Sequence, residues 1–455
     1  MDVVIIETPS LGDRTYLVHD GEVALVVDPQ RDVDRVLRAA ADAGVRITHV
    51  AETHVHNDYV SGGLTLARLT GATYVHAAAE PLTFEHEPVG DGDSFDVGRL
   101  RVEVLLTPGH TPHHLSYLVD SPGGPTAAFT GGSMLYGTVG RTDLIGPDAT
   151  ADLTRAQFRS AHRIADRLPD QAHLYPTHGF GSFCASASSD EESDGTIGTE
   201  RVVNLALTTT DEEAFVERLL AGLDAYPRYY AHMGPLNLAG GVAIDLSPPA
   251  EADPAELARR IHRGEWVVDL RPRRAFAASH VAGTLNVELD DAFSTYLAWL
   301  LPWGMPVTLV GDEADDIAEA QRQLVRVGID RPSGAAHGGI DRWAPAADRS
   351  SYPAMTFAQL ADEPRLTLLD VRLAGERADG HIDGSLHVPL PELVQRMEEL
   401  PDAPLAVHCA SGYRSSIAAS LLDRAGREVV LVDDAFERAA DSGRTVLTES
   451  ERRDG

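Results

Sequence analysis

Short apolar runs alternate with amphipathic stretches along the first half of the chain. Runs rich in branched and aromatic residues predict strands at 3–6, 16–18, 23–27, 47–51, 100–106, 115–119 and 127–130. An apolar period of three to four residues predicts helices at 31–43, 151–168 and 212–223. Between two of these helices, the Ser-, Asp- and Glu-rich segment 184–198 predicts an exposed loop. The alternation of strands and helices indicates an α/β fold.

Two linkers and an internal repeat divide the rest of the chain. Residues 247–251 and 344–352 have the composition of linkers. At an offset of 101 residues, Val-Asp-Leu-Arg at 268–271 aligns with Leu-Asp-Val-Arg at 369–372, and the His-x-x-Gly segment at 280–285 aligns with that at 381–386. The sequence therefore predicts a multi-domain α/β protein with a larger domain at 1–245 and two related smaller α/β domains at 252–345 and 353–447.

Composition narrows the chemistry. The 455 residues carry 38 basic side chains, all arginine, against 70 acidic ones, for a net charge of −32. The absence of lysine excludes Schiff-base enzymes and Walker A loops, and the acidity argues against nucleic-acid partners. The apolar stretch 296–310 is interrupted by two prolines, and no basic region precedes the N-terminal apolar run, so we expect a cytoplasmic protein without a membrane partner.

Histidines follow two of the predicted strands and one further short strand-like segment. His54, His56 and Asp58 come after the strand at 47–51, His110 comes after the strand at 100–106, and His178 follows an apolar Leu-Tyr-Pro segment. Imidazole and carboxylate groups delivered to strand ends are what a transition-metal site needs. We therefore expect a metal pocket with His54, His110, His56, Asp58 and His178 as candidate ligands.

These motifs resemble the metallo-β-lactamase family, which implies an αββα sandwich. Residues 129–132 and 140–143 resemble the persulfide dioxygenase branch, in which two histidines and one aspartate hold one Fe(II). That resemblance implies His54 and His110 as ligands, and it implies that Arg141 contacts the thiol substrate. The aspartate position holds Gly132, so the third ligand has to come from His56, Asp58, His178 or water.

Two other interpretations of the first domain stay open. A glyoxalase II-like thioester hydrolase with bound zinc would need the last motif histidine and a bridging aspartate, but those positions hold Tyr59 and Gly132. Alternatively, the domain has lost its metal and serves only for binding. Cys184, six residues after His178, is a candidate sulfur carrier or shield of the site, or an inert buried cysteine.

The last domain carries a cysteine loop. A strand at 404–408 leads into Cys409-Ala410-Ser411-Gly412-Tyr413-Arg414-Ser415, and a helix at 416–425 follows. Backbone N–H groups at such a helix start stabilise a thiolate and bind anions, and Arg414 adds a fixed positive charge. The loop resembles the rhodanese active site, which implies Cys409 and Arg414 as catalytic residues and Ser411, Gly412 and Ser415 as substrate-binding residues. Phosphatase loops of similar outline are one residue longer.

Two departures from the rhodanese pattern stand out. Asp433 and Asp434 replace the usual glycines before the final helix, and we expect these carboxylates to weaken binding of anionic sulfur donors. In the first repeat the cysteine position holds Gly311 and the arginine position falls near Asp316, so we expect that domain to be inactive.

The resemblance as a whole is to bacterial persulfide dioxygenase–rhodanese fusions. It implies that iron oxidises a low-molecular-weight thiol persulfide with O2 to thiol and sulfite, and that Cys409 transfers sulfane sulfur to form thiosulfate. It also implies a homo-oligomer.

Overall fold

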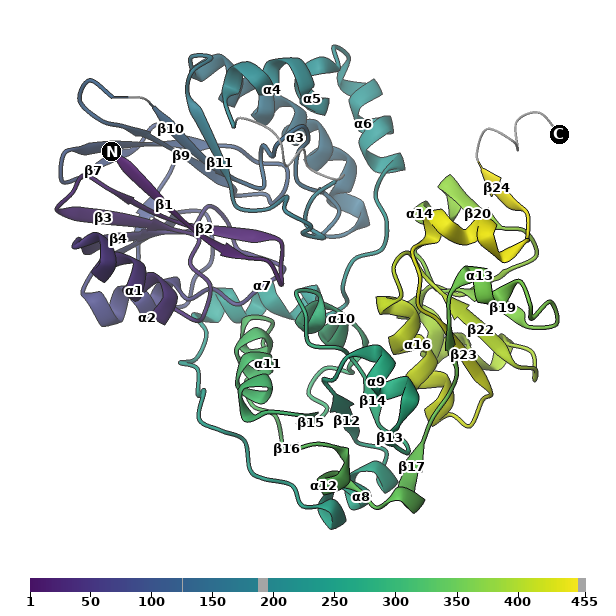
Figure 1. Ribbon diagram of the computed structural model, residues 1–455. Coiled ribbons are helices and arrows are strands. Elements are labelled where there is room, and N and C mark those ends of the chain that lie inside the picture. The colour runs from purple at the N-terminus through teal and green to yellow at the C-terminus, as the bar shows by residue number, and fades with distance from the viewer. Residues whose placement is uncertain (125, 187–194, 449–455) are drawn as a thin grey trace. The chain divides into compact units, whose positions relative to one another are not determined.

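The computed structural model describes residues 1–124, 126–186 and 195–448. They divide into two compact units (Figure 1). The first contains residues 1–245 together with 324–328, and the second contains 246–323 and 329 onward. The division at residues 245 and 246 falls beside the proline-rich segment 247–251 that the sequence marks as a linker.

The first unit is built on two sheets. One has the order β1-β2-β3-β4-β5-β6, and the other has the order β11-β10-β9-β8-β7. The strands are β1 (Asp2–Thr8), β2 (Asp13–His19), β3 (Val23–Val27), β4 (Arg46–Ala51), β5 (Thr73–Ala77), β6 (Glu87–Val89), β7 (Ser94–Val97), β8 (Leu100–Leu106), β9 (Leu115–Asp120), β10 (Ala127–Gly131) and β11 (His173–Pro176). All seven strands predicted in this region are present.

Alternating side chains explain why the two sheets stack with helices outside them. Tyr16 and Val18 of β2 join residues of β8, β9 and β10 in one core between the sheets, whereas Leu17 packs outward against helices α1 and α2. On the other sheet, Leu118 packs outward against α3 and α6. The result is the αββα sandwich, with α1 and α2 on one face and α3 to α6 on the other (Figure 1).

The helices of this unit are α1 (Asp34–Ala43), α2 (Gly63–Thr70), α3 (Pro147–Arg167), α4 (Ile197–Val203), α5 (Leu205–Thr208), α6 (Glu212–Ala221) and α7 (Tyr230–Ala239). Helix α1 begins at Asp34, three residues later than predicted, and Arg35 in its first turn pairs with the buried carboxylate of Asp32. It ends at Gly44, whose φ of 67° a side chain would disfavour.

One expectation for the first unit is wrong. Of the segment predicted to be exposed, residues 187–194 lie outside the described residues, but Cys184 at one end is fully buried. It is buried because its neighbour Ala185 pairs with Gly140 in an isolated bridge, which draws the segment into the fold.

Among the described residues, no helix is both long and apolar enough to cross a bilayer.

The second unit contains two parallel sheets of the same topology. The first has the order β14-β12-β15-β16 and the second has the order β18-β23-β22-β19-β21. The first repeat contains α8 (Pro254–His262), β12 (Trp266–Asp269), α9 (Arg273–Ala278), β13 (His280–Val281), β14 (Leu285–Asn286), α10 (Phe293–Leu300), β15 (Val307–Gly311), α11 (Ala314–Arg326), β16 (Gly334–His337) and α12 (Ile340–Trp343).

The sheet of the second repeat has the same four strands in the same order and adds β18 at one edge. The first repeat ends with β17 (Arg349–Ser350), which pairs with β13. The second repeat contains β18 (Ala354–Met355), α13 (Phe357–Leu360), β19 (Thr367–Asp370), α14 (Ala374–Asp379), β20 (Gly380–Ile382), β21 (Leu386–His387), α15 (Leu393–Arg396), β22 (Leu405–His408), α16 (Tyr413–Arg424), β23 (Val429–Val432) and β24 (Val446–Thr448). The repeated Asp-x-Arg motif forms the same buried ion pair in both copies, Asp269–Arg271 at 2.6 Å and Asp370–Arg372 at 2.8 Å. These aspartates and arginines are therefore structural.

Candidate metal centre and cysteine loop

The predicted metal ligands of the first unit all lie just beyond strand ends. His54, His56 and Asp58 follow β4, His110 follows β8 and His178 follows β11. All five side chains are buried, with 0–1% exposure. The ring centroid of His54 lies 4.8 Å from that of His110 and 5.2 Å from that of His178. The fold therefore gathers these side chains into one buried cluster.

Hydrogen bonds fix which nitrogen each imidazole presents. Nδ1 of His110 lies 2.7 Å from the carbonyl oxygen of Arg141, which can only accept, so Nδ1 carries the proton and Nε2 carries the lone pair. Nδ1 of His178 lies 2.8 Å from the carboxylate of Asp13 with the same polarity. Nε2 of His110 is buried and has no hydrogen-bond partner. Acceptors on Nδ1 orient metal-binding histidines in this way.

His54 follows the same pattern. The Thr53 hydroxyl donates to Asp28 at 2.7 Å, so its oxygen accepts the Nδ1 proton of His54 at 2.8 Å. This leaves Nε2 of His54 facing Nε2 of His178 at 3.3 Å. Two ligand nitrogens bound at about 2.0–2.1 Å to a tetrahedral ion are separated by about 3.3–3.4 Å. A metal ion therefore fits between these two nitrogens.

The charges around the cluster also favour a cation. Burial opposes protonation of His178, but the nearby carboxylates of Asp58 and Asp13 outweigh it and raise the pKa of His178 well above its usual value. Burial, together with the neighbouring imidazoles, lowers the pKa of His110 to about 3 and holds that of His54 well below normal. The pocket therefore accommodates one positive charge, a proton or a metal ion.

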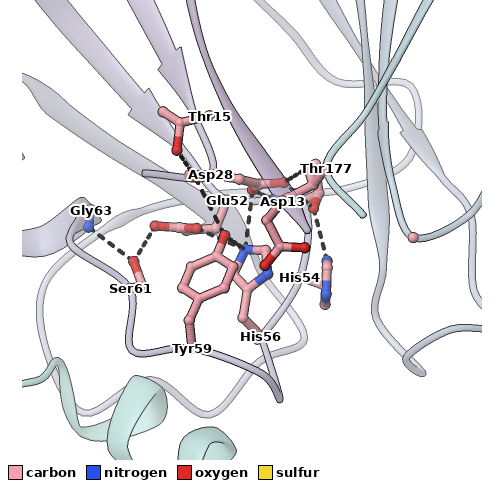
Figure 2. Close-up of polar contacts among 12 residues, drawn as sticks. Asp13, Thr15, Asp28, Glu52, His54, His56, Tyr59, Ser61, Gly63 and Thr177 are labelled. Atoms are coloured by element: carbon pink, nitrogen blue, oxygen red, sulfur yellow. Dashed lines mark hydrogen bonds and ion pairs between the residues drawn. The ribbon is translucent and has the colours of Figure 1, made fainter. Parts of the chain in front are cut away.

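The ring of His56 is held by other groups than those that hold His54, His110 and His178; Figure 2 shows it beside Asp28, Glu52 and Tyr59. Its Nε2 lies 3.1 Å from Glu52, 3.3 Å from Asp28 and 3.0 Å from the Tyr59 hydroxyl. Although burial opposes it, the charges of Asp28 and Glu52 raise the pKa of His56 to about 9. Burial in turn raises the pKa of Glu52 to about 7. Only Nδ1 of His56, which has no hydrogen-bond partner, remains as a donor atom toward His54 and His178.

Position 132 has no room for a side chain. The Gly132 N–H donates to Nε2 of His114 at 3.0 Å, and a Cβ placed on Gly132 would lie 2.3 Å from Cδ2 of His110. The imidazole of His114, to which the sequence assigns no ligand role, stacks on His54 with centroids 4.8 Å apart. Histidine packing thus occupies the space of the carboxylate that the resemblance implies.

Arg141 is buried at 3% exposure and is held by the protein itself. Its guanidinium donates to both carboxylate oxygens of Asp143, at 2.7 and 2.8 Å, and to the carbonyl oxygens of Asp224 and Phe183. The ring of Tyr226 covers it at 4.5 Å. Its charge is therefore already paired where the resemblance implies a contact with substrate.

Cys184 lies in the same cluster. Its sulfur and one nitrogen each of His110 and His178 lie within 4.8 Å of one another. Burial raises the pKa of the Cys184 thiol well above its usual value, and the charges of Asp58 and Asp13 add to this effect. The neutral thiol is therefore the stable form in the absence of a cation.

The cysteine loop of the second unit connects β22 to α16. Cys409 directly follows β22, and Gly412, with a φ of 98°, turns the chain so that its N–H donates to the Cys409 sulfur at 3.2 Å. The hydroxyl of Ser415 lies 3.6 Å from the same sulfur. Helix α16 begins at Tyr413, three residues earlier than predicted, so Arg414 and Ser415 lie in its first turn. Ser411 is exposed at the rim of the loop.

The guanidinium of Arg414 is paired with a carboxylate. Two of its nitrogens donate to Glu376 at 2.5 and 2.6 Å, a bidentate ion pair. Burial opposes the charge, but Glu376 raises the pKa of Arg414 further above its usual value. An anion that binds Arg414 must therefore compete with Glu376.

The predicted repulsion from Asp433 is offset by two arginines of the first repeat. Arg273 donates to Asp433 at 2.6 Å, and Arg274 donates to its other carboxylate oxygen. Burial opposes it, but these two charges lower the pKa of Asp433. Asp434 instead accepts the backbone N–H of Phe357 at 3.1 Å. The first repeat thus contributes charge beside the cysteine loop of the second.

The matching loop of the first repeat has no nucleophile. It starts from Gly311, and Asp316 turns back to accept the backbone N–H of Glu313 at 2.9 Å. The loop therefore presents carboxylates where the second repeat has Cys409 and Arg414.

Comparisons with known proteins agree with this architecture. Residues 14–178 match the metallo-beta-lactamase superfamily, and residues 253–346 and 354–441 each match the rhodanese-like domain. The chain is 28% identical to human "Persulfide dioxygenase ETHE1, mitochondrial" over 240 residues, which are 52% of this chain and 82% of that protein. It is 32% identical to a hydroxyacylglutathione hydrolase of Maricaulis maris over 189 residues, 39% of this chain and 67% of that protein.

A crystal structure of a metallo-beta-lactamase from Staphylococcus aureus, 27% identical, superposes with a TM-score of 0.66 over 73% of this chain and 98% of that chain. The chain therefore belongs to the metallo-β-lactamase superfamily. Its metallo-β-lactamase domain has persulfide dioxygenase homologues and is followed by tandem rhodanese-like domains, which is the organisation of a persulfide dioxygenase–rhodanese fusion.

Proposed function

We propose that the first unit oxidises a low-molecular-weight thiol persulfide at a single iron ion and that Cys409 transfers sulfane sulfur. The observation that carries the proposal is the convergence of the Nε2 atoms of His54 and His178 at 3.3 Å beside the unpartnered Nε2 of His110. Tyr59 and Gly132 stand where a two-metal hydrolytic centre needs ligands, which favours one ion over two.

In the first reaction, RSSH, O2 and H2O give RSH, sulfite and two protons. Iron, when bound, would supply open coordination positions for persulfide and O2 and would mediate the transfer of electrons from the outer sulfur of the persulfide to O2. His54, His110 and His178 hold the ion, while Thr53 and Asp13 fix two of these rings through Nδ1. Burial of all three imidazoles keeps bulk water away from the centre.

In the second reaction, the Cys409 thiolate attacks the outer sulfur of a persulfide. An S–S bond forms at Cys409, the donor S–S bond breaks, and the thiol leaves with the electron pair. Sulfite then attacks the outer sulfur of the Cys409 persulfide, which forms thiosulfate and restores the thiolate. The Gly412 N–H and the start of α16 stabilise negative charge on sulfur throughout.

The Arg414–Glu376 pair sets which sulfur donor this loop prefers. Because both terminal nitrogens of Arg414 donate to Glu376, the positive charge that Arg414 presents to a substrate is largely neutralised. The sulfonate of thiosulfate would need that guanidinium, whereas the terminal sulfur of a thiol persulfide carries less charge. We therefore propose a thiol persulfide as the preferred donor.

Replacing Glu376 by glutamine should lower the KM for thiosulfate in cyanide-dependent sulfur transfer by about three- to tenfold, because it releases Arg414 from a partly exposed ion pair. Glutamine keeps the oxygen that accepts the Leu373 N–H, so α14 retains its cap. The KM for glutathione persulfide should change less than twofold. The matched control is Glu399→Gln, which removes an exposed carboxylate paired with Arg396. An unchanged KM for thiosulfate in Glu376→Gln would contradict the proposed preference.

A thioester hydrolase is the second candidate for the first unit, favoured by the 32% identity to a hydroxyacylglutathione hydrolase. It would bind zinc and cleave hydroxyacylglutathione without O2. A third candidate is a metal-free binding domain attached to a sulfurtransferase. Both differ from the proposal in metal content and in the need for O2.

The test uses the full chain purified without oxygen. Metal analysis should find about one iron per chain, and glutathione or coenzyme A persulfide should drive O2 uptake and sulfite formation. Zinc with O2-independent thioester cleavage would support the hydrolase instead. Absence of both metal and O2 uptake, with thiocyanate formation from thiosulfate and cyanide intact, would leave only the sulfurtransferase.

A further inference from the structure

The proposed centre has three neutral imidazole ligands but no anionic ligand at position 132. Gly132 cannot be replaced by a carboxylate in this arrangement, since even a Cβ there would lie 2.3 Å from the His110 ring. A divalent ion held by imidazoles alone would bring one positive charge more than this fully buried pocket accommodates. An anionic ligand from elsewhere in the chain would reduce that cost.

Asp58 is the anionic group nearest in sequence to His54 and His56. Its carboxylate, however, contacts Nδ1 of His178, whereas the proposed ion lies at Nε2 of that ring. Its Oδ2 is 3.3 Å from Nδ1 of His178, and Asp13 lies 2.8 Å from the same nitrogen. The Nε2 atom of His178, which faces His54, points away from both carboxylates. Asp58 and Asp13 thus orient the ring of His178 through its Nδ1 atom.

Cys184 lies close to two of the proposed ligands. Its sulfur, with one nitrogen each of His110 and His178, forms a group of donor atoms within 4.8 Å of one another. The second observation is independent of the cysteine: Nε2 of His110, a member of the same group, is buried and has no hydrogen-bond partner. Nitrogen and sulfur are the donors that zinc, cobalt and iron accept in proteins.

The backbone on both sides of Cys184 is fixed. Its carbonyl oxygen accepts the Arg141 N–H at 2.8 Å, and its own N–H donates to the Ser182 hydroxyl at 3.2 Å. Arg141 is in turn anchored by Asp143. The arginine that the resemblance assigns to substrate thus holds the cysteine segment against the histidines.

We propose that Cys184 is a metal ligand and acts with His110 and His178 as the anionic donor of the centre. On binding, the S–H bond breaks, the thiolate binds the divalent ion and the proton leaves to solvent, so metal binding releases one proton from this residue. The inference rests on the metal centre of the proposed function and does not depend on its reaction with O2.

The test loads the metal-free full chain with Co²⁺. The wild-type protein should show a near-ultraviolet thiolate-to-cobalt charge-transfer band, and it should release one proton more per bound ion than Cys184→Ser does. Cys184→Ser should lose the band and bind Co²⁺ about tenfold or more weakly. The control Cys409→Ser should keep the band, because it removes the other thiol of the chain. A band that survives in Cys184→Ser, or that is lost in Cys409→Ser, overturns the proposal.

A measurement on the unaltered protein guards against a Cys184→Ser variant that fails to fold. X-ray absorption at the metal edge of the zinc-loaded wild type should show one sulfur neighbour at about 2.3 Å. A coordination shell of nitrogen and oxygen alone overturns the proposal, as does sulfane sulfur found on Cys184 in the metal-loaded protein, since a persulfidated thiol would then be a carrier. Persulfide-dependent O2 uptake is scored separately, so failure of the oxidation reaction leaves the ligand result intact.

Discussion

Replacing Cys409 by serine should reduce sulfur transfer from persulfide or thiosulfate by about 10³-fold or more, because the hydroxyl cannot form the persulfide intermediate. Cyanide-dependent thiocyanate formation measures the rate, and mass spectrometry of the intact chain detects the added sulfur atom. Serine is smaller and nearly isosteric at a position with 1% exposure, so the loop should keep its fold.

The same variant supplies its own control. Because the metal centre lies in the first unit and Cys409 lies in the second, persulfide-dependent O2 uptake should stay within about twofold of wild type. The product should change from thiosulfate to sulfite. Loss of both activities in Cys409→Ser would contradict the division of the chemistry between the two units.

Replacing His54 by alanine should remove the bound iron and lower persulfide-dependent O2 uptake by about 100-fold or more, since it deletes a proposed ligand from the centre. The Nε2 of His178 would lose the nitrogen that faces it at 3.3 Å. Metal analysis after purification without oxygen and an oxygen electrode measure the two effects. Sulfur transfer at Cys409 should be unchanged.

The matched control is His173→Ala, which removes an exposed histidine of β11 that is not part of the cluster. This variant should keep both its iron and its O2 uptake. Full iron content in His54→Ala would exclude His54 as a ligand, and equal loss in His173→Ala would point to general instability of the unit.

The fold was largely predictable because its signals are local or repeated. Alternating residues such as Tyr16, Leu17 and Val18 indicate a strand with two buried faces, and the structure places them in two different cores. The 101-residue repeat predicted two related sheets, whose strand orders match. The start of α1 was predicted three residues too early, because apolar periodicity does not mark the exact residue at which a helix begins.

Only part of the candidate site could be predicted from the sequence. Histidines placed after strands predicted the cluster, but not which ring nitrogen each one presents. That depends on Asp13, which lies 165 residues from His178, and no motif links the two. The Arg414–Glu376 pair could not be predicted either, because the two residues are 38 positions apart and no motif links them. The pair reduces the positive charge that Arg414 presents to an anion.

The contact of Arg273 and Arg274 with Asp433 makes the two repeats interdependent. The first repeat has no nucleophile in its loop, but its two arginines neutralise the carboxylate of Asp433. That carboxylate lies against Gly412 of the cysteine loop, so close that a Cβ on Gly412 would be 2.3 Å from its oxygen. Residues 353–447 on their own would carry that charge unbalanced beside the catalytic loop. We therefore expect a fragment of this chain with full sulfurtransferase activity to begin before residue 273. Substitutions of Arg273 or Arg274 in the first repeat should then affect the cysteine loop of the second.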